Sequence, residues 1–376
     1  MKIYYLIYSF FYFIKQIFLR KHYDIIFYAP SHFNRGDNNE NLYFKDLLNI
    51  CKRFNISFIY FEEPDNYNNQ ERSNIAIPFD FIYYLVVLLR KLMGSEMKYT
   101  HIDKKIGNFI SKIFFRNITH NNFITLSQSM LSLFSGINSK SKKFDLQHGT
   151  IHAKKKSYIY NGIPSENISE NKVIILLTGN SFKDILIKSD KTGYFIHNTK
   201  VIGSNLDCKA ILSSKINKNV LVSLQFTHDH THEENLLIYE KLILLIKKNK
   251  SYHFYLRLHP RFNNEIKISN ILSFSNTSLV CESLNENLKM CSFHLTTYST
   301  ITFKAALYSI PTSFIKIDSE KMNIFNTAYK YPFFNHSLDD LYKNYDYCSS
   351  EVKIWSENFH MPLSNNEFKR ILRYEK

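Results

Sequence analysis

Three short polar stretches carry the side chains that are best suited to chemistry. They are His148-Gly149-Thr150, His259-Pro260 and Tyr298-Ser299-Thr300, and each follows an apolar run that is typical of a buried strand. Ligands of α/β proteins bind at the carboxyl ends of parallel strands, so we expect all three stretches to line a ligand site. Imidazole groups exchange protons near neutral pH, while hydroxyl and backbone N–H groups bind anions. These residue types therefore favour proton transfer combined with phosphate binding.

Residues 293–312 predict a strand, a turn rich in hydroxyl groups, and a helix that begins near Ser299 or Thr300. The first backbone N–H groups of a helix have no acceptor within that helix, which leaves them available to an anion. We therefore predict that Ser299, Thr300 and Thr302 bind a nucleotide phosphate. A simple helix cap is the commoner role of such residues, and this alternative stays open.

His148 follows Phe144-Asp145-Leu146-Gln147 and precedes Gly149, which permits a tight turn that exposes the imidazole ring. A histidine at such a position can act as a general base. The alternative for an isolated histidine is a structural, hydrogen-bonded role. Beside His148, we expect Gln147, Gly149, Thr150 and, after the next strand, Asn180 to face the acceptor or the cleft.

Pro260 restricts the backbone of His259 to extended or turn geometry, which fixes the direction of the imidazole ring. Arg257 and Arg261 lie two residues away on either side, so along a strand they share a face with His259. We predict that His259 and Arg257 bind the phosphate of a leaving group, because guanidinium groups bind phosphate well. A surface ion pair is the alternative role for either arginine.

Residues 227–234 alternate imidazole and carboxylate groups, which suggests a metal site at first sight. Metal sites need ligands that converge from fixed elements, whereas this run predicts an exposed loop before a helix. We expect Thr231 or His232 to cap that helix, and Glu233 and Glu234 to interact with its dipole. We assign no metal and no cofactor, and one of the loop histidines stays a candidate for contact with a ligand.

The elements that must position these residues alternate between strands and helices. Predicted strands lie at residues 24–31, 56–61, 122–127, 142–150, 173–178, 220–226, 253–258 and 278–281. Helical patterns separate most of them, which is typical of a parallel, right-handed, doubly wound sheet. A length of 376 residues suits two domains. We therefore predict an α/β protein with two Rossmann-like doubly wound domains that face a cleft.

The polar segment at residues 213–219 is typical of a linker, and the strand pattern restarts directly after it. We therefore assign residues 21–212 to an N-terminal acceptor domain and residues 213–376 to a C-terminal nucleotide-donor domain.

Residues 3–19 form an aromatic-rich apolar run that is flanked by Lys2, Arg20 and Lys21, and we assign residues 1–20 to an amphipathic N-terminal helix. The run is slightly short for a membrane span, which needs about 20 apolar residues, and it contains Lys15 and Gln16. It lacks a small-residue cleavage site of the kind that follows a signal peptide. Two interpretations are equally favoured: an amphipathic helix at a membrane surface, or a helix packed on the domain that follows.

The composition narrows the class of partner. A formal net charge of +15 indicates a polyanionic partner or substrate, such as a nucleotide-activated donor, an anionic membrane or a nucleic acid. The cations are spread along the chain, and neither zinc-finger spacing nor an RNA-binding motif is present, so we do not expect a nucleic-acid partner. The five cysteines lack CxxC spacing, which suggests free thiols in a reducing cytoplasm.

In this order and spacing, residues 145–150, 256–260 and 297–311 resemble motifs of the GT-B glycosyltransferases of bacterial surface polysaccharide assembly. Among these, the pattern is most similar to the superfamily of CDP-glycerol glycerophosphotransferases and of capsule or lipooligosaccharide sialyl- and Kdo-type transferases. The resemblance implies that His148 is the general base and that His259 is a phosphate ligand. It likewise implies that Ser299 and Thr300 are phosphate-binding hydroxyls.

The resemblance also implies a function. It is the inverting, metal-independent transfer of a sugar from a CMP- or UDP-linked donor to a glycan or lipid-linked acceptor of capsule, O-antigen or lipooligosaccharide. The enzyme would be cytoplasmic, or peripheral on the inner face of the cytoplasmic membrane.

Two positions depart from the family pattern. This chain has Gln147-His148-Gly149 where bacterial sialyltransferases usually have an acidic residue pair before glycine, and Lys304 where many retaining or UDP-sugar enzymes have a glutamate. The alternatives are a CDP-polyol phosphotransferase of teichoic-acid-like capsule synthesis, a nucleotide-sugar epimerase on the same two-domain frame, and a non-catalytic scaffold at a membrane surface.

Overall fold

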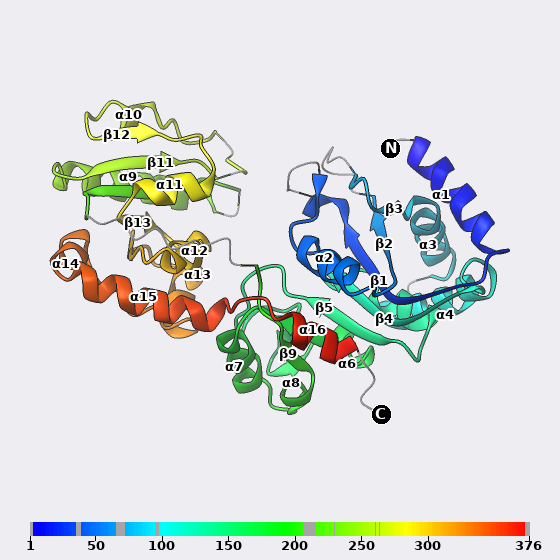
Figure 1. Cartoon of the computed structure of the whole chain (residues 1–376). Coiled ribbons are helices and arrows are strands. Elements are labelled where there is room, and N and C mark those ends of the chain that lie inside the picture. Colours follow the sequence, from blue (N-terminus) through cyan, green and yellow to red (C-terminus); the bar gives the residue numbers. More distant parts are fainter. Residues whose placement is uncertain are drawn as a thin grey trace. The chain divides into compact units, whose positions relative to one another are not determined.

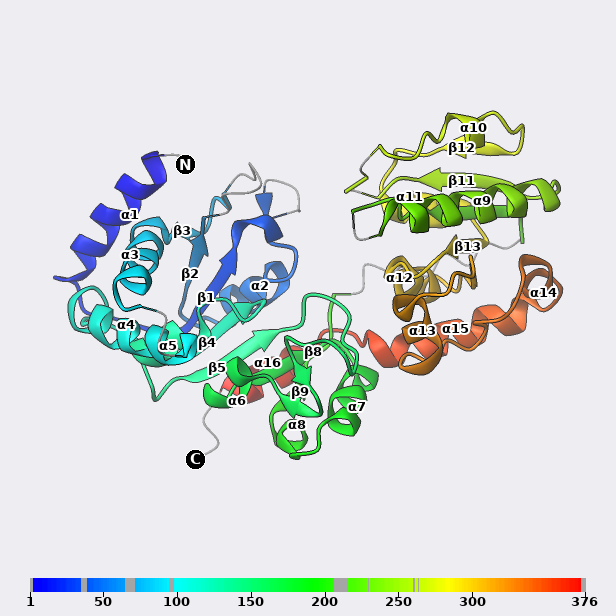
Figure 2. The same cartoon turned by 180° about the vertical axis from the view of Figure 1, so that it is seen from behind.

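The computed structural model describes residues 3–34, 39–64, 72–94, 98–205, 216–228, 230–259, 261–262 and 264–372. The chain forms two compact units (Figures 1 and 2). Unit 1 consists of Met1–Asn205 together with Pro362–Lys376, and unit 2 consists of Leu206–Met361. Each unit contains its own parallel β-sheet with helices packed against it.

The sheet of unit 1 has seven strands in the order β3-β2-β1-β4-β5-β8-β9, and all neighbouring pairs are parallel. The strands are β1 (Lys21–Pro30), β2 (Phe58–Glu63), β3 (Ile77–Pro78), β4 (Ile118–Leu126), β5 (Lys142–Leu146), β8 (Ile174–Leu177) and β9 (Thr199–Val201). Strands β2 and β3 follow β1 on one side of the sheet, and strands β5, β8 and β9 follow β4 on the other side. The carboxyl ends of β1 and β4 therefore flank the topological switch point, where ligands of such sheets bind.

Helices connect the strands of unit 1. They are α1 (Ile3–Gln16), η1 (Ser31–Phe33), α2 (Lys45–Arg53), α3 (Asp80–Leu92), α4 (Tyr99–Ile113), α5 (Leu131–Ile137), α6 (Glu166–Glu170), α7 (Asn180–Ser189), α8 (Tyr194–His197) and α16 (Asn365–Leu372). A short antiparallel pair, β6 (Ile159–Tyr160) and β7 (Ile163–Pro164), lies between β5 and α6.

The side chains of the central strand β1 point alternately to the two faces of the sheet, so the core of unit 1 has a part on each face. Ile25 and Phe27 of β1 lie in a buried cluster with residues of α2 and α16. On the other face, the ring of Tyr28 contacts those of Phe79 and Phe134, which precede α3 and lie in α5. Both faces of β1 are thus covered by helices, which explains why its second half is apolar at consecutive positions.

Helix α1 packs on unit 1 through one side. Phe13 is fully buried, and its ring contacts those of Phe61, Phe79 and Phe115. The hydroxyl of Ser9 accepts a hydrogen bond from the backbone N–H of Phe81 at 3.2 Å. No helix among the described residues is long and apolar enough to cross a bilayer.

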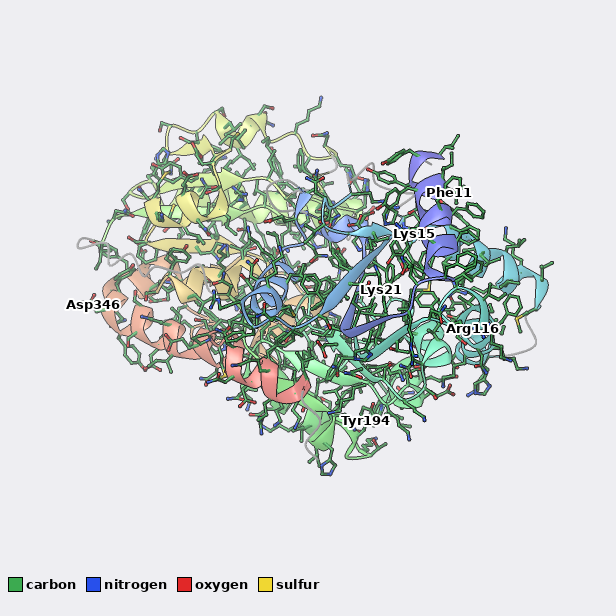
Figure 3. All side chains as sticks on the ribbon, turned by 45° about the vertical axis from the view of Figure 1, so that its right-hand side comes forward. Phe11, Lys15, Lys21, Arg116, Tyr194 and Asp346 are labelled. Carbon is green, nitrogen blue, oxygen red and sulfur yellow. The ribbon has the colours of Figure 1, made fainter. Side chains whose placement is uncertain are left out.

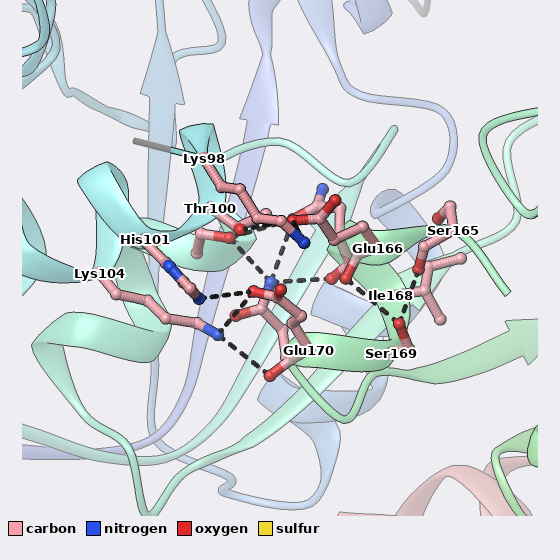
Figure 4. A network of polar contacts seen from close by, with 12 residues as sticks. Lys98, Thr100, His101, Lys104, Ser165, Glu166, Ile168, Ser169 and Glu170 are labelled. Atoms are coloured by element: carbon pink, nitrogen blue, oxygen red, sulfur yellow. Dashed lines mark hydrogen bonds and ion pairs between the residues drawn. The ribbon is translucent and has the colours of Figure 1, made fainter. Parts of the chain in front are cut away.

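Polar contacts join α4 to α6 (Figure 4). The ammonium group of Lys104 lies 3.4 Å from the carboxylate of Glu170, and that of Lys98 lies 3.3 Å from Glu166. The hydroxyl of Thr100 donates to Glu166 at 3.2 Å. Most basic groups at this end of α4 thus face carboxylates of α6.

The C-terminal segment belongs to unit 1, whereas the sequence places residues 213–376 together in the second domain. In α16, Phe368, Ile371 and Leu372 lie in the buried cluster that contains α2 and β1. The backbone N–H of Ser364 donates to the carbonyl of Ile202 at 2.8 Å. The domain assignment is corrected at this end because burial of these three apolar side chains fixes α16 against the first sheet. Residues 213–215 of the linker expected at 213–219 lie outside the described residues, residues 216–218 belong to no helix or strand, and Asn219 begins β10.

The sheet of unit 2 has five parallel strands in the order β12-β11-β10-β13-β14. They are β10 (Asn219–Ser223), β11 (His253–Arg257), β12 (Thr277–Leu279), β13 (Phe293–Thr296) and β14 (Thr312–Phe314). The helices are α9 (His232–Lys248), α10 (Ser269–Leu272), α11 (Leu284–Met290), α12 (Ile301–Leu307), α13 (Glu320–Thr327), α14 (Leu338–Lys343) and α15 (Tyr345–Phe359). By the same reasoning, the switch point lies between β10 and β13.

Candidate active site

In unit 1, the loops that follow β1 and β5 meet at His148. Its ring makes an edge-to-face contact with Phe33, with centroids 5.2 Å apart, and a more distant one with Tyr43 at 6.3 Å. His148 is half-buried and follows the end of β5 by two residues. The structure therefore places the predicted base beside the switch point, with the direction of its ring set by aromatic neighbours.

Gln147 is buried and holds the loop that carries His148. Its side-chain N–H donates to the carbonyl of Gly149 at 2.8 Å. Its side-chain oxygen accepts hydrogen bonds from the backbone N–H and the hydroxyl of Thr178, at 3.0 and 3.2 Å. Gln147 thus links the ends of β5 and β8 and has a structural part in the site.

Gly149 is exposed, and its backbone does not adopt the left-handed conformation that favours glycine. A Cβ at this position would meet only the end of the Lys155 side chain, at 3.9 Å. The chain bends at Gly149, but this backbone conformation does not itself require a glycine. A side chain at position 149 would therefore project into open space at the surface of the loop that carries His148.

A buried group beneath this loop escaped the sequence analysis. The carboxylate of Asp145 accepts hydrogen bonds from the backbone N–H of Gln128 at 2.8 Å and from the hydroxyl of Tyr158 at 3.0 Å. Burial raises the pKa of Asp145 to about 7, against the lowering effect of these hydrogen bonds and of Lys155. The ammonium group of Lys155 donates to the carbonyl of Thr150 at 2.9 Å, so this cluster holds the far end of the loop.

The loop after β4, which lies between those after β1 and β5, has unusual backbone geometry. Ser127, Gln128 and Met130 all have φ values between +54° and +58°, a region that residues other than glycine rarely adopt. The hydrogen bond from Gln128 to Asp145 helps to hold this conformation. Strained residues of this kind cluster at functional sites. Asn180 is exposed at the first turn of α7 and follows β8 on the same edge of the sheet.

In unit 2, the carboxyl ends of β10 and β13 are joined by Gln225. Its side-chain oxygen accepts hydrogen bonds from the hydroxyls of Thr296 and Thr297 and from the backbone N–H of Tyr298, the last at 2.9 Å. Deeper in the sheet, the imidazole of His294 bonds to the hydroxyls of Ser223 and Thr312, and burial lowers its pKa to about 3. His294 is therefore a neutral structural group.

The predicted phosphate-binding residues lie where β13 meets α12. Ser299 is buried, and its hydroxyl accepts from the backbone N–H of Ile301 at 3.2 Å, so part of its hydrogen-bonding capacity serves the helix. The N–H groups of Thr302 and Phe303 donate to the carbonyls of Ser299 and Thr300. The amides available to a ligand are consequently fewer than the sequence suggests. Thr300 is exposed and makes no side-chain cap, which leaves its hydroxyl to solvent or a ligand.

His259 lies in a short turn after β11, and Pro260 lies outside the described residues. The backbone N–H of Arg261 donates to Nδ1 of His259 at 3.0 Å, so Nδ1 is unprotonated and Nε2 carries the ring proton. His259 is therefore oriented as a hydrogen-bond donor. Arg257 uses one guanidinium nitrogen for the carbonyl of Glu282 at 2.6 Å and the side chain of Asn287 at 2.7 Å, which is a structural role.

The histidine loop before α9 caps that helix as expected. Thr231 and Glu234 form reciprocal hydrogen bonds at its first turn, which confirms Thr231 as the cap. His228 and His232 lie within 4 Å of the carboxylate of Glu265, and Asp229 lies outside the described residues. Within the part of the chain that the structure describes, no three His, Cys, Asp or Glu side chains are grouped to hold a metal ion.

His230 differs from its neighbours because it is buried. Its Nδ1 lies 3.1 Å from the side-chain oxygen of Asn235, whose amide N–H groups donate elsewhere, so Nδ1 carries the proton and Nε2 is an acceptor. The ring contacts that of Tyr298 edge to face at 5.2 Å. Among the described residues, His230 Nε2, the Tyr298 hydroxyl and the Thr302 hydroxyl are buried without a hydrogen-bond partner. Such atoms cost about 1–3 kcal/mol each unless a ligand or water satisfies them.

Among the comparisons with known proteins, only those with solved structures give a match, and they identify the fold. No known protein family matches the sequence, and no curated protein is similar to it in sequence. Solved structures nevertheless match nearly the whole chain. A UDP-N-acetylglucosamine 2-epimerase from Methanocaldococcus jannaschii, solved with UDP-N-acetylglucosamine and UDP, has a TM-score of 0.53 at 12% identity and covers 94% of this chain and 99% of its own.

Two further structures are similar to the same degree. The wall teichoic acid polymerase TagF has a TM-score of 0.53 at 13% identity, covering 97% of this chain and 91% of that chain. The UDP-N-acetylglucosamine 2-epimerase from Neisseria meningitidis has a TM-score of 0.52 at 11% identity, covering 94% and 98%. At such identities the similarity establishes the fold alone. The predicted class, an α/β protein with two Rossmann-like domains of the GT-B type, is confirmed.

Proposed function

We propose that this protein is a glycosyltransferase that transfers a sugar from a CMP- or UDP-linked donor to a glycan or lipid-linked acceptor of a bacterial surface polysaccharide. The observation that carries the proposal is the chemistry at the switch points of the two sheets. Unit 1 carries His148 next to the exposed Gly149, and unit 2 carries hydroxyl and imidazole groups of the types that bind phosphate. The structures that share the fold include proteins described as bound to UDP or UDP-N-acetylglucosamine, which supports a nucleotide-sugar donor.

In this proposal, His148 accepts the proton of an acceptor hydroxyl. Because Nδ1 of its ring is buried, Nε2 is the nitrogen that a substrate can reach. The acceptor oxygen then attacks the anomeric carbon and the bond from that carbon to the phosphate oxygen breaks, with inversion. The departing nucleotide phosphate receives hydrogen bonds from His259 Nε2–H and from the hydroxyls of Ser299, Thr300 and Thr302, while Arg257 adds positive charge. No metal ion is required for this scheme.

Transfer of a polyol phosphate from a CDP-linked donor is the second candidate. The similarity to a teichoic acid polymerase, which has also been solved after a soak with CDPG, favours it. The chemistry differs in one step, because the hydroxyl activated by His148 would attack phosphorus and the nucleotide would leave as a monophosphate. A screen of donors against one acceptor separates the two functions.

His148→Ala tests the role of the base. We expect kcat to fall by about 10²–10⁴-fold with donor binding unchanged, since a positioned general base contributes a factor of that size. Turnover and nucleotide affinity are measured on the same preparation. His197→Ala is the matched control because His197 is exposed on α8, and it should retain full activity. Wild-type turnover by His148→Ala would refute the assignment.

A further inference from the structure

One side of α1 is buried in unit 1, and the other is apolar yet exposed. The exposed residues Tyr4, Ile7, Tyr8, Phe10 and Phe11 are called the aromatic face here, and Tyr4 and Phe11 are 69% and 64% exposed. Beyond the helix end, Phe18 is 79% exposed. A surface helix ordinarily has polar residues on its outer side, whereas a large exposed apolar patch marks an interaction surface.

Ring contacts continue the aromatic face into the neighbouring helices. Phe10 meets Phe81 of α3 edge to face at 5.1 Å, and Phe81 meets Phe114, which follows α4, at 5.2 Å. The aromatic face is thus fixed to a packed layer of three helices. The ring of Phe10 is thereby held in place before any partner binds, which lowers the entropy that this side chain loses on binding.

Basic groups gather at the C-terminal end of the aromatic face. Figure 3 shows Phe11 and Lys15 on α1, together with Lys21 and Arg116. The backbone N–H of Lys21 donates to the carbonyl of Asn117 at 2.8 Å, which brings Lys21 close to Arg116 in the folded chain. Lys15, Arg20, Lys21 and Arg116 are all exposed, and within the described residues none of the four forms an ion pair.

Acidic groups on the same helices do not offset this charge. Helix α1 contains no acidic residue, and α3 and α4 contain one each, Asp80 and Asp103. Both are buried and paired, Asp80 with Arg72 at 3.0 Å and Asp103 with Arg90 at 2.7 Å. The exposed charged side chains of α1, α3 and α4 are therefore basic, which complements an anionic surface.

We propose that the aromatic face and its basic end dock the protein on an anionic lipid bilayer, with α1 lying parallel to the membrane plane. Tyrosine and phenylalanine side chains partition into the headgroup region, and nearby cations attract anionic lipids. Docking of unit 1, which carries His148, selects a lipid-linked acceptor over a soluble glycan. This choice of acceptor rests on the proposed function, whereas docking itself does not.

Flotation of the full-length protein with vesicles tests docking without any substrate. We expect the protein to float with vesicles of phosphatidylcholine that contain 30% phosphatidylglycerol. With vesicles of pure phosphatidylcholine, it should remain in the bottom fraction. Phe11→Asp and Lys15→Glu should each weaken the partition coefficient at least about fivefold, since one basic residue near such a membrane contributes roughly that factor. The test uses single substitutions and not a deletion of α1, because the deletion would also remove the buried Phe13.

Leu244→Asp is the matched control, because Leu244 is an apolar residue of α9 in unit 2 with 66% exposure. It should float like the wild type. Equal loss in the control, or no flotation of the wild type, overturns the proposal. A wild-type dimer that Phe11→Asp converts to a monomer in light scattering, without vesicle binding, would make the aromatic face a contact between copies of the chain and also overturn it. Loss of turnover in His148→Ala with intact flotation separates docking from catalysis.

Discussion

At the scale of single residues, Asp145 is the group with the clearest physical consequence. It is fully buried, and its carboxylate is bonded to neutral donors, with Lys155 as the cation that influences it. Burial outweighs these contacts, so its pKa rises from the ordinary 3.8 to about 7. The folded protein therefore holds a proton at Asp145 that the unfolded chain has already released at mildly acidic pH.

The sign of the resulting pH dependence follows directly. A raised pKa stabilises the folded state fully below about pH 4, and this stability is lost as the pH rises to about 7. Between pH 5 and pH 7 the loss is about 2–3 kcal/mol, at 1.36 kcal/mol for each pH unit. Urea unfolding at several pH values should show that the Asp145→Asn variant does not lose this stability between pH 5 and pH 7. Asp184→Asn, at an exposed position of α7, should keep the wild-type slope.

At the scale of elements, α4 and α5 pack closely because both carry a glycine at their contact. A Cβ on Gly136 would lie 2.1 Å from the carbonyl oxygen of Lys104, and one on Gly107 would lie 2.1 Å from that of Leu133. Both obstacles are backbone atoms, which cannot move without displacing a helix. Helix α5 begins at the loop that bonds to Asp145, so this packing also supports the candidate site.

Gly136→Ala should therefore lower the free energy of unfolding by about 3 kcal/mol, at the upper end of the usual cost of overpacking. Gly149→Ala serves as the control because its Cβ meets only a flexible lysine end, and its effect should stay within about 0.5 kcal/mol. Thermal unfolding of the three proteins at one pH checks both values. A stable Gly136→Ala variant would mean that α5 can shift without cost.

Some elements were predictable from sequence because burial on both faces of a parallel strand leaves a continuous apolar run. Strands β1 and β10 lie close to their predicted positions for this reason. Strands β4 and β11 also lie close to their predicted positions, although β11 alternates buried and half-buried side chains. The place of α16 was not predictable, since its apolar periodicity shows that the helix is buried but not against which sheet.

Within the candidate site, the position of His148 followed from its place after a strand. The roles of Arg257 and Asp145 did not, because they depend on partners distant in sequence, such as Asn287 and Tyr158.

At the scale of the whole molecule, unit 2 contains a natural reporter of nucleotide binding. Trp355 of α15 is the single tryptophan of the chain, and its ring stacks on that of Phe303 in α12 with centroids 4.8 Å apart. Phe303 directly follows Thr302, so a ligand at the predicted phosphate site lies close to the fluorophore in the fold.

CMP, CDP, UDP and GDP should therefore raise the unfolding temperature that tryptophan fluorescence reports, and the preferred nucleotide identifies the donor class. Ligand at 100 times its Kd stabilises by about 2.7 kcal/mol, which is readily measured. Inorganic phosphate at equal concentration controls for anion binding alone. If none of the four nucleotides shifts the transition, a non-catalytic scaffold replaces the transferase as the favoured function.

The return of α16 to the first sheet makes unit 1 discontinuous along the chain. Residues 206–361 are contiguous, so unit 2 is encoded by one uninterrupted stretch. The core of unit 1 also needs Phe368, Ile371 and Leu372, which follow that stretch. N-terminal domains usually fold first during translation, but unit 1 can complete its core only after residues 368–372 have been made. A chain that ends between residues 362 and 367 would therefore carry the full sequence of unit 2 and a first sheet that lacks part of its buried cluster.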